Sequence, residues 1–489
     1  MRKIGETQYD KGGIRVSRVD EWTAQNFIRD EEITAALKQG QVKAQDHDYI
    51  RKVLQRAAEG TGLTHQEAAV LLEVQDDQVW QEIFQLARQV KEKIYGKRIV
   101  MFAPLYVSNY CVNNCSYCGY KYDNKHFARR RLTMDELARE VEVLESLGHK
   151  RIALEAGEDP QNCPLDYILD CLKTIYSLKF ANGSIRRINV NIAATTVEDY
   201  RKLKDAEIGT YILFQETYHK PTYEHMHPQG PKRDYDWHTT AMDRAMEAGI
   251  EDVGIGVLYG LYDYKYETIA MLQHAEHLEE KFGVGPHTVS VPRLRAAENV
   301  SLDTYPHLVS NEEFKKIVAV LRLALPYAGM ILSTREEPGF RDEALALGVS
   351  QISAGSCTGV GGYVQEYLSK YAEEKPQFEV GDHRSPLEII KSLIRAGYIP
   401  SYCTACYREG RTGDRFMRLA KTGQIGNICQ PNALLTLQEY LLDYGDEEAR
   451  RLGDELIRNS LEDIPKLAAK QAAVERLARI AAGERDLRF

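Results

Sequence analysis

Three cysteines lie close together in the first quarter of the chain, at Cys111, Cys115 and Cys118. Their spacing is C-x3-C-x2-C, and thiolates are soft ligands that suit iron–sulfur clusters and zinc. A four-iron cluster has four irons to coordinate, so three cysteines leave one iron open for a substrate or cofactor. Structural zinc instead prefers paired C-x2-4-C knuckles and four ligands. We therefore favour a [4Fe-4S] cluster over zinc for this group.

A second group, Cys403, Cys406 and Cys429, has the spacing C-x2-C-x22-C. Three thiolates again suggest a [4Fe-4S] cluster with one open iron. A zinc site with a distant fourth ligand is the alternative, because spacing alone does not separate the two. The other three cysteines are scattered, and we interpret them as small buried hydrophobic residues.

The composition restricts the kind of partner. The chain has 489 residues, of which 43% are hydrophobic, and its net charge is −9. An acidic chain argues against a nucleic-acid partner, which requires a basic patch. No apolar run reaches the roughly 18 residues of a membrane span, and the N-terminal residues lack the apolar stretch of a secretory signal. We expect a cytoplasmic protein with neither nucleic-acid nor membrane partner, whose clustered thiols bind metal.

Strands and helices alternate through the middle of the chain. Eight short apolar stretches predict strands at 98–108, 151–156, 187–193, 210–216, 252–258, 287–293, 329–334 and 349–354. Helical segments separate most of them, which predicts a parallel sheet. Eight such units favour a complete (β/α)8 TIM-type barrel over a doubly wound open sheet. We expect the fold class α/β, with the barrel at 98–397.

The flanking regions are predicted to be helical additions to this barrel. Residues 1–97 form a helical N-terminal extension, in which a capping box at Thr64–Glu67 starts one long helix that runs to Tyr95. The last barrel helix is expected at 386–397. Residues 398–489 form a C-terminal domain that carries the second cysteine group, with no clear periodicity up to 430 and helices after 433.

The first cysteine group follows the first predicted strand, which is where barrels place their active sites. Here the chain resembles the radical S-adenosylmethionine (SAM) superfamily. The resemblance implies that the open iron chelates the methionine amine and carboxylate of SAM, and that reduction of the cluster splits SAM into methionine and a 5′-deoxyadenosyl radical. The protein would supply positioning and exclusion of water.

Further SAM-site residues are implied by the same resemblance. Ala156, Gly157 and Glu158 follow the second strand and are similar to the family's Gly-Gly-Glu motif, so Glu158 would accept a hydrogen bond from the SAM ammonium. Gly254 and Gly256 on the fifth strand partly resemble an adenine-packing element, although strand glycines are often only close-packing sites.

Two residues beside these motifs complete the site predicted at the C-terminal ends of the strands, which we call the upper site. We assign Tyr117, inside the cysteine loop, to cofactor binding. Glu155 is either a barrel-lining acid or a surface acid.

The second cysteine group carries a narrower resemblance. The stretches C-T-x-C-Y-R-x-G-R-T-G, from Cys403, and C-Q-P-N-A, from Cys429, are similar to the HydG family of [FeFe]-hydrogenase maturases, which are tyrosine lyases. The related thiamine-pathway lyase ThiH shares the barrel and lacks this cysteine set. The resemblance implies that L-tyrosine is cleaved between Cα and Cβ to p-cresol and dehydroglycine.

The same resemblance implies a second reaction and further partners. Dehydroglycine would become carbon monoxide and cyanide at the second cluster, on an extra iron held through a free L-cysteine. The hydrogenase maturases HydE and HydF are the implied protein partners. A ThiH-type lyase with a C-terminal zinc or vestigial cluster, and a non-enzymatic iron–sulfur scaffold, remain the alternatives.

Candidate substrate and metal ligands come from the predicted strand ends. Arg335 and Ser333, at the end of the seventh strand, are our candidates for the tyrosine carboxylate, because arginine makes bidentate bonds to carboxylates. The alternative for Arg335 is a surface ion pair with a neighbouring glutamate. His287 begins the sixth strand, at the N-terminal or lower rim of the barrel, and imidazole suits iron. It is our candidate ligand for the extra iron.

Two further features have open interpretations: the segment after the fourth predicted strand, and the two arginines that follow Cys406. The segment 217–238 contains four histidines, and its irregular spacing favours a lid or solvent loop over a metal site. Arg408 and Arg411 either stabilise cluster or product anions or make structural bonds to the loop. Strand direction predicts that the two cysteine groups lie at opposite ends of the barrel, joined only through its interior.

Overall fold

The computed structural model describes residues 22–126, 128–297, 300–368, 376–464 and 466–489. The strands are β1 (Arg98–Ser108), β2 (Arg151–Ala156), β3 (Arg187–Asn191), β4 (Tyr211–Ile212), β5 (Val253–Gly256), β6 (Thr288–Ser290), β7 (Gly329–Leu332), β8 (Gln351–Ser353) and β9 (Ile399–Ser401). The helices that precede and accompany the first five strands are η1 (Ala24–Asn26), α1 (Asp30–Lys43), α2 (His47–Glu59), α3 (His65–Leu72), α4 (Asp77–Tyr95), α5 (Met134–Ser146), α6 (Leu165–Ser177), α7 (Val197–Asp205), α8 (Lys220–Met226), η2 (Pro231–Arg233), α9 (Tyr235–Thr239) and α10 (Ala241–Glu247). The later helices are α11 (Tyr264–Phe282), η3 (Leu302–Thr304), α12 (Asn311–Ala324), α13 (Pro338–Leu347), α14 (Gly362–Leu368), α15 (Pro386–Arg395), α16 (Ala405–Arg408), α17 (Gly413–Lys421), α18 (Gly426–Asp443), α19 (Glu447–Glu462) and α20 (Leu467–Ala481).

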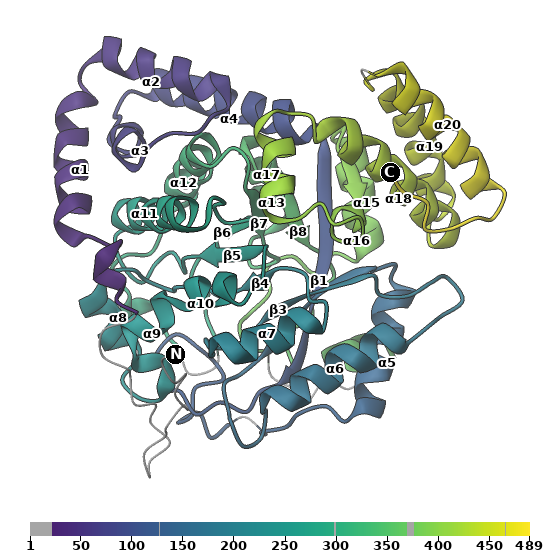
Figure 1. Cartoon of the computed structure of the whole chain (residues 1–489), viewed down its shortest axis with the longest axis horizontal. Helices are drawn as coiled ribbons and strands as arrows, with labels where there is room; N and C mark the ends of the chain where they lie inside the picture. The colour runs from purple at the N-terminus through teal and green to yellow at the C-terminus, as the bar shows by residue number, and fades with distance from the viewer. Residues whose placement is uncertain (1–21, 127, 298–299, 369–375, 465) are drawn as a thin grey trace, which may run out of the picture.

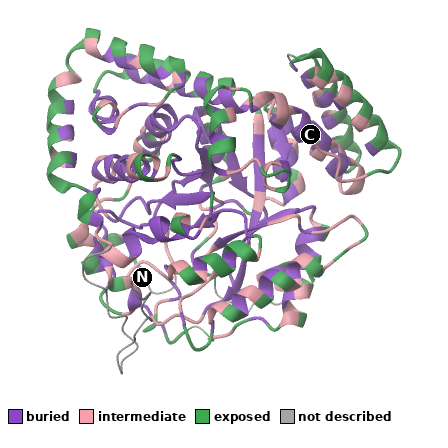
Figure 2. Cartoon of the chain, in the orientation of Figure 1, coloured by how far each residue is buried: buried purple, intermediate pink, exposed green. Residues whose placement is uncertain are grey.

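Eight parallel strands close into a barrel, as the alternating pattern predicts. The strand order is β2-β3-β4-β5-β6-β7-β8-β1, and a further pairing of β1 with β2 completes the ring. Helices surround this ring, and the buried residues concentrate along the strands and the inner faces of the helices (Figures 1 and 2). All eight predicted strands are present, although β4 is much shorter than the stretch 210–216.

The long strand β1 joins the barrel to the C-terminal region. Its upper part pairs with β2 from Ala103 onward, while its first residues pair with β9, so that Val100 lies opposite Ser401. The strand β9 is absent from the sequence-based prediction, because a three-residue strand has no readable alternation. Its pairing places the second cysteine group beside the N-terminal end of β1.

The N-terminal helices α1 to α4 pack against the barrel helices α11 and α12, at the upper left of Figure 1. The capping box predicted at Thr64 is present, with the Thr64 side chain and Glu67 bonded reciprocally. The single long helix predicted after it is wrong, since α3 ends at Leu72 and α4 begins at Asp77. The Asp76 side chain accepts hydrogen bonds from the backbone N–H groups of Gln78 and Val79, so a second helix begins there and the first one does not continue.

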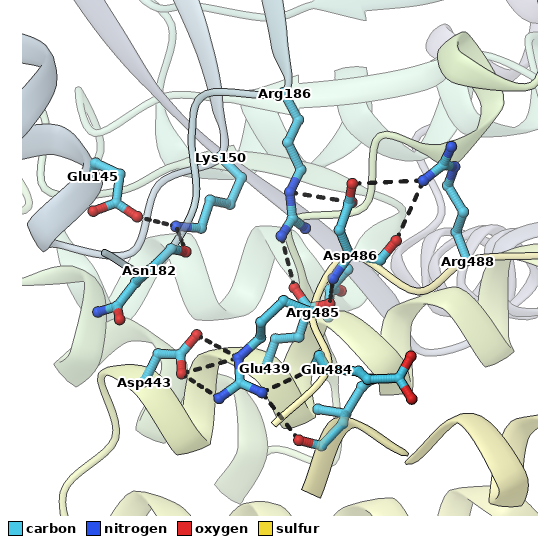
Figure 3. Close-up of polar contacts among 12 residues, drawn as sticks. Glu145, Lys150, Asn182, Arg186, Glu439, Asp443, Glu484, Arg485, Asp486 and Arg488 are labelled. Carbon is cyan, nitrogen blue, oxygen red and sulfur yellow. Dashed lines mark hydrogen bonds and ion pairs between the residues drawn. The ribbon is translucent and has the colours of Figure 1, made fainter. Parts of the chain in front are cut away.

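The C-terminal residues fold back onto the segment that carries the second cysteine group. Asp486 pairs with Arg408 and with Arg186, Arg485 makes a bidentate pair with Asp443, and Arg488 pairs with Glu409. Figure 3 shows the part of this network around Arg186, Arg485 and Asp486. Arg186, from the barrel, also pairs with Glu439 of α18 at 2.9 Å. These pairs connect the barrel, the helix α18 and the last residues of the chain.

Among the described residues, no helix is both long and apolar enough to cross a lipid bilayer.

Candidate active site

A cavity of ≈ 230 Å³ opens at the C-terminal end of the barrel strands. Its walls come from the inner faces of β1, β2 and β3 and from the segments that follow β4, β7 and β8. The cysteine loop reaches it through Cys118. The cavity therefore lies where the sequence predicts the active site of the barrel.

The cysteine loop is held in place by backbone hydrogen bonds to two other segments. The Val112 N–H donates to the Glu158 carbonyl at 2.8 Å, and the Asn114 N–H donates to the Gln229 carbonyl at 3.1 Å. The Ser116 N–H donates to the Met226 carbonyl at 3.0 Å. Three thiols on a loop without helix or strand are thus positioned by the ends of β2 and of α8.

The three thiols of this loop share one electrostatic environment. Burial raises the pKa of Cys111 to about 11, and the nearby Cys118 raises it further. Burial also raises the pKa of Cys115 and of Cys118. Without metal the thiols are protonated, so binding of a metal cluster must release these protons.

The structure brings together the residues assigned to SAM by the Gly-Gly-Glu resemblance. Ala156, Gly157 and Glu158 all line the cavity. The Asn113 side-chain amide donates to the Glu158 carboxylate at 2.7 Å. A Cβ at Gly157 would overlap the carbonyl oxygen of Tyr110, so this position has room only for glycine.

Tyr117 also lies in the cavity wall. Its hydroxyl is 2.8 Å from His227 Nε2, and the two rings meet edge to face. By contrast, Gly254 and Gly256 are not among the residues that line the cavity. A Cβ at either would press into neighbouring strands, against Thr288 or Phe214, which is a packing role for both glycines. Their contribution to adenine binding stays a prediction.

Arg335 and Ser333 lie together in the opposite wall. Both line the cavity, and the Arg335 guanidinium lies 3.3 Å from the centroid of the Phe378 ring. The ion pair with Glu336 does not form, since that carboxylate binds Arg293 and Arg295. Burial lowers the pKa of Arg335, which stays a cation at neutral pH. Arg335 is thus a charged group held on an aromatic surface and directed at the cavity.

The segment with four histidines differs from the predicted lid or solvent loop. It contains the helices α8 and α9, and both His227 and His238 are buried. The His238 Nε2 atom lies 2.9 Å from the Phe214 carbonyl, and burial lowers its pKa well below the usual value. Pro and Gly in this segment start short helices, so their presence does not indicate an exposed loop here.

A second and much smaller cavity, of ≈ 40 Å³, lies at the N-terminal end of the strands. Cys403, Cys406 and Cys429 line it together, although 22 residues separate the last two. Tyr95, at the end of α4, closes one side. The two cysteine groups lie at opposite ends of β1, because Cys403 follows the partner of Val100 and Cys111 follows Ser108.

The smaller cavity is lined by cations. Arg98 and Arg151 face it from the first residues of β1 and β2, and no carboxylate is among its described lining residues. Arg151 is 4% exposed, and the Nε atoms of both arginines have no hydrogen-bond partner in the described part of the chain. Buried guanidinium groups favour an anionic occupant, such as a thiolate-bound cluster or a small anion.

The thiol of Cys406 differs from the three thiols of the upper loop. A hydrogen bond with Cys429 and another with Arg411 lower the pKa of Cys406 to about 6, against the opposing effect of burial. Cys429, its partner, has a raised pKa. Arg411 also bonds the main-chain oxygen of Phe489. Arg408 pairs with Asp486. Of its two interpretations, anion stabilisation or a structural bond, this contact is a structural bond.

His287 lines the smaller cavity together with the three cysteines, as its position at the start of a strand predicts. It is 8% exposed, and its Nδ1 lies 3.4 Å from an Asp252 carboxylate oxygen. The ring lies against Phe416, with 4.5 Å between the ring centroids. Burial lowers the pKa of His287, so the imidazole is neutral at pH 7.

On several strands, two neighbouring residues of the same face line the two cavities. On β1, Val100 lines the smaller cavity and Phe102 the larger one. On β8, the corresponding residues are Gln351 and Ser353. Alternate strand residues share a face and are roughly 7 Å apart along the strand. The two cavities therefore lie at successive levels of the barrel interior, and a passage between them stays a prediction.

Two family models match this chain. The radical SAM superfamily matches residues 105–275, and the Biotin and Thiamin Synthesis associated domain matches residues 290–399. A crystal structure described as HydG, a maturase of the [FeFe]-hydrogenase, is 62% identical and superposes with a TM-score of 0.91. It covers 95% of this chain and 100% of its own. The chain belongs to the HydG family.

More distant relatives agree with this membership. The HydG structure from Carboxydothermus hydrogenoformans is 41% identical, covers 94% of this chain and 100% of its own, and has a TM-score of 0.80. The 2-iminoacetate synthase of Escherichia coli (strain K12) is 28% identical over 349 residues, which are 71% of this chain and 89% of that protein. This HydG-family chain is therefore a radical SAM maturase of the [FeFe]-hydrogenase type.

Membership of the radical SAM superfamily implies a [4Fe-4S] cluster and SAM, and the upper site of this HydG-family chain fits both. Cys111, Cys115 and Cys118 are free thiols on one loop, Cys118 lines the cavity, and the backbone of Gly157 packs directly against this loop at Tyr110. Among the described residues, no three His, Cys, Asp or Glu side chains are arranged so that they could hold one metal ion. A four-iron cluster does not require such a group, since its thiolates bind different irons.

Several residues of the site escaped the sequence-based prediction. Arg98 and Arg151 are the first residues of two strands, and their equivalent positions could have indicated a shared cationic rim. Lys232 and Glu216 form an ion pair of 2.7 Å in the upper cavity wall. Neither has a sequence signal, because their contact depends on a turn in which Glu216 adopts a φ of 68°.

Proposed function

We propose that this protein cleaves L-tyrosine between Cα and Cβ, giving p-cresol and dehydroglycine, in the upper cavity. Dehydroglycine would then pass through the barrel and break down to carbon monoxide, cyanide and water in the lower site, where Cys403, Cys406 and Cys429 would hold a second iron–sulfur cluster. The proposal includes an extra iron bound by His287 and by a free L-cysteine. These products supply the active site of an [FeFe]-hydrogenase, with HydE and HydF as partners.

The observation that carries this proposal is the convergence of the second cysteine group on a cation-lined cavity below the barrel. The three thiols, His287 and two buried arginines surround one small volume that faces the barrel interior. Cyanide and carboxylates are anions, and this cationic site favours them. A lyase that only made dehydroglycine would have no use for such a site.

The residues of the upper cavity have separate roles in the proposal. When bound, the first cluster and SAM supply the radical that removes a hydrogen atom from the tyrosine amine. Arg335 and Ser333 hold the substrate carboxylate, and Phe378 keeps the guanidinium in position. Glu158 and its partner Asn113 orient the ammonium group of SAM. The surrounding barrel excludes water from the reacting atoms.

The test is anaerobic turnover of the reconstituted protein with SAM, dithionite and L-tyrosine. p-Cresol is assayed by chromatography and carbon monoxide is trapped with deoxyhaemoglobin. We expect both products from the wild type. Formation of p-cresol without carbon monoxide would instead favour the activity of the E. coli 2-iminoacetate synthase, to which the chain is also similar. Absence of SAM cleavage would favour an iron–sulfur scaffold.

A further inference from the structure

Two charged groups in the upper cavity have no ion-pair partner among the described residues: Arg335 and Glu155. Arg335 lies beyond the end of β7, and Glu155 faces the cavity from β2. Of the other charged groups of the wall, Glu216 pairs with Lys232 at 2.7 Å, and Glu158, which accepts from Asn113 at 2.7 Å, is the residue that we assign to SAM. A cation and a carboxylate thus remain available to a ligand in the same cavity.

The strand register fixes the place of Glu155. It lies opposite Tyr106 on β1 and opposite Asn191 on β3, and all three residues line the cavity. Neighbouring strands are about 4.8 Å apart, so these side chains form one row across the wall. Glu155 is three residues before Glu158, the residue that we assign to SAM. It therefore lies in the part of the cavity where substrate and cofactor must meet.

An α-amino acid is the chemical class that fits an unpaired cation and an unpaired carboxylate facing one cavity. Its carboxylate can bind to Arg335 through two hydrogen bonds. Its ammonium group needs a hydrogen-bond acceptor nearby, and a buried ammonium without one is strongly disfavoured. The described lining of this part of the cavity offers the Glu155 carboxylate for that purpose.

We propose that Glu155 binds the α-ammonium group of the amino-acid substrate and accepts one proton from it. The transfer converts a carboxylate and an ammonium into a carboxylic acid and a neutral amine, so charge and atoms balance. The neutral amine is the group from which the proposed reaction removes a hydrogen atom. This assignment rests on the proposed function and names the residue that prepares the substrate for it.

The surroundings of Glu155 are suited to this exchange. Burial raises the pKa of Glu155 to about 8, against the lowering effects of the Asn191 hydrogen bond and of Arg335. An α-amino group has an ordinary pKa of about 8, so the proton can move between the two groups at little cost. The other titratable group in this row, Tyr106, has a raised pKa and stays neutral in the same range.

The test compares two ligands that differ only in the amine: L-tyrosine and 3-(4-hydroxyphenyl)propanoate. Binding is measured by anaerobic equilibrium dialysis with the reconstituted protein and SAM, without reductant, so that no turnover occurs. We expect the wild type to prefer L-tyrosine, and Glu155→Gln to weaken L-tyrosine binding by about 10- to 100-fold, as expected when a buried charge pair loses one partner. Binding of the propanoate should change less than about threefold, because it has no ammonium group.

Matched controls separate this role from a structural one. Glu280→Gln removes an exposed carboxylate and should leave both affinities unchanged. Equal weakening of both ligands by Glu155→Gln, or an unchanged preference for L-tyrosine, would overturn the assignment. If the wild type forms no p-cresol, the proposed function fails. If it forms p-cresol while Glu155→Gln keeps its preference, only the role of Glu155 fails.

A second measurement needs no variant. The preference of the wild type for L-tyrosine over the propanoate should rise from about pH 6 to a maximum near pH 8, because Glu155 ionises over this range, and should fall above it, because the ammonium group of the ligand then loses its proton. The ligand carboxylates are ionised throughout and Arg335 stays charged, so neither produces this change. A preference that is independent of pH would contradict the proposal even if the glutamine variant did not fold.

Discussion

The two cysteine sites of this protein share a donor set and differ in everything around it. The upper three thiols lie on a loop that reaches a cavity of ≈ 230 Å³ through Cys118, and the wall of this cavity contains both carboxylates and cations. The lower three border ≈ 40 Å³, lined by arginines with no carboxylate among the described lining residues. The upper site can hold a cofactor together with a zwitterionic substrate. The lower site suits small anions bound directly to metal.

The difference teaches that the same set of three cysteines can stand in two unlike environments. At the upper end, the loop follows a strand and its thiols have raised pKa values because of burial. At the lower end, hydrogen bonds with Cys429 and with Arg411 lower the pKa of Cys406, whereas burial raises the pKa of Cys403. The two groups of three cysteines therefore lie in different electrostatic surroundings.

The sharpest test of this comparison removes one thiol from each site. Cys115→Ala should abolish both p-cresol and carbon monoxide, since the upper cluster starts the reaction. The double variant Cys403→Ala with Cys406→Ala should keep p-cresol and reduce carbon monoxide to below about a tenth, because loss of a ligand exceeds the 10- to 100-fold cost of losing an outer partner. Chromatography and the haemoglobin trap measure both. Equal loss of both products in the double variant would contradict two separate sites.

His287 allows a finer distinction within the lower site. His287→Ala should leave p-cresol and the iron of both clusters unchanged while lowering carbon monoxide and cyanide by about tenfold or more, because a metal ligand is lost. Iron analysis and electron paramagnetic resonance of the second cluster provide the measurement. His225→Ala, in the segment after β4, is the matched control. Normal carbon monoxide from His287→Ala would exclude this histidine as the ligand of the extra iron.

At the upper site, Gly157→Ala tests the close approach of the backbone. The added methyl group would meet the Tyr110 carbonyl, and overpacking of this kind costs about 1–3 kcal/mol. We expect the Kd for SAM to rise about tenfold, while the second cluster keeps its iron and its spectrum. Gly339→Ala is a control, because nothing lies within 4 Å of a Cβ there. Unchanged SAM binding would mean that the loop adjusts freely.

The smallest effect is expected at the C-terminal residues that pair with the segment carrying the second cysteine group. Asp486→Asn weakens the pairs with Arg408 and Arg186, which are partly exposed, so the loss of stability should be about 1 kcal/mol or less. We expect faster loss of iron from the second cluster on dilution into chelator, with the first cluster unaffected. Glu462→Gln, which weakens an exposed pair with Lys470, is the control. Equal loss from both clusters would show that the effect is not local.

Much of the site follows from local sequence patterns. The cysteine spacing, the eight strands and the capping boxes at Thr64, Thr133 and Ser310 all depend on residues a few positions apart. The position of His287 at the lower rim follows from strand direction alone. The division of helix α3 from α4 was missed, because the N-cap Asp76 lies within an otherwise continuous helical pattern.

The sequence by itself therefore determined the barrel and the radical SAM cysteine motif, since both depend on the spacing of residues a few positions apart. The tertiary structure alone decided which side chains meet across the barrel. Cys429 joins Cys406 across 22 intervening residues, and Arg335, after β7, lines the same cavity as Glu155 of β2. Such contacts depend on closure of the sheet, which brings the first and last strands together. No local pattern encodes the partners that this closure creates.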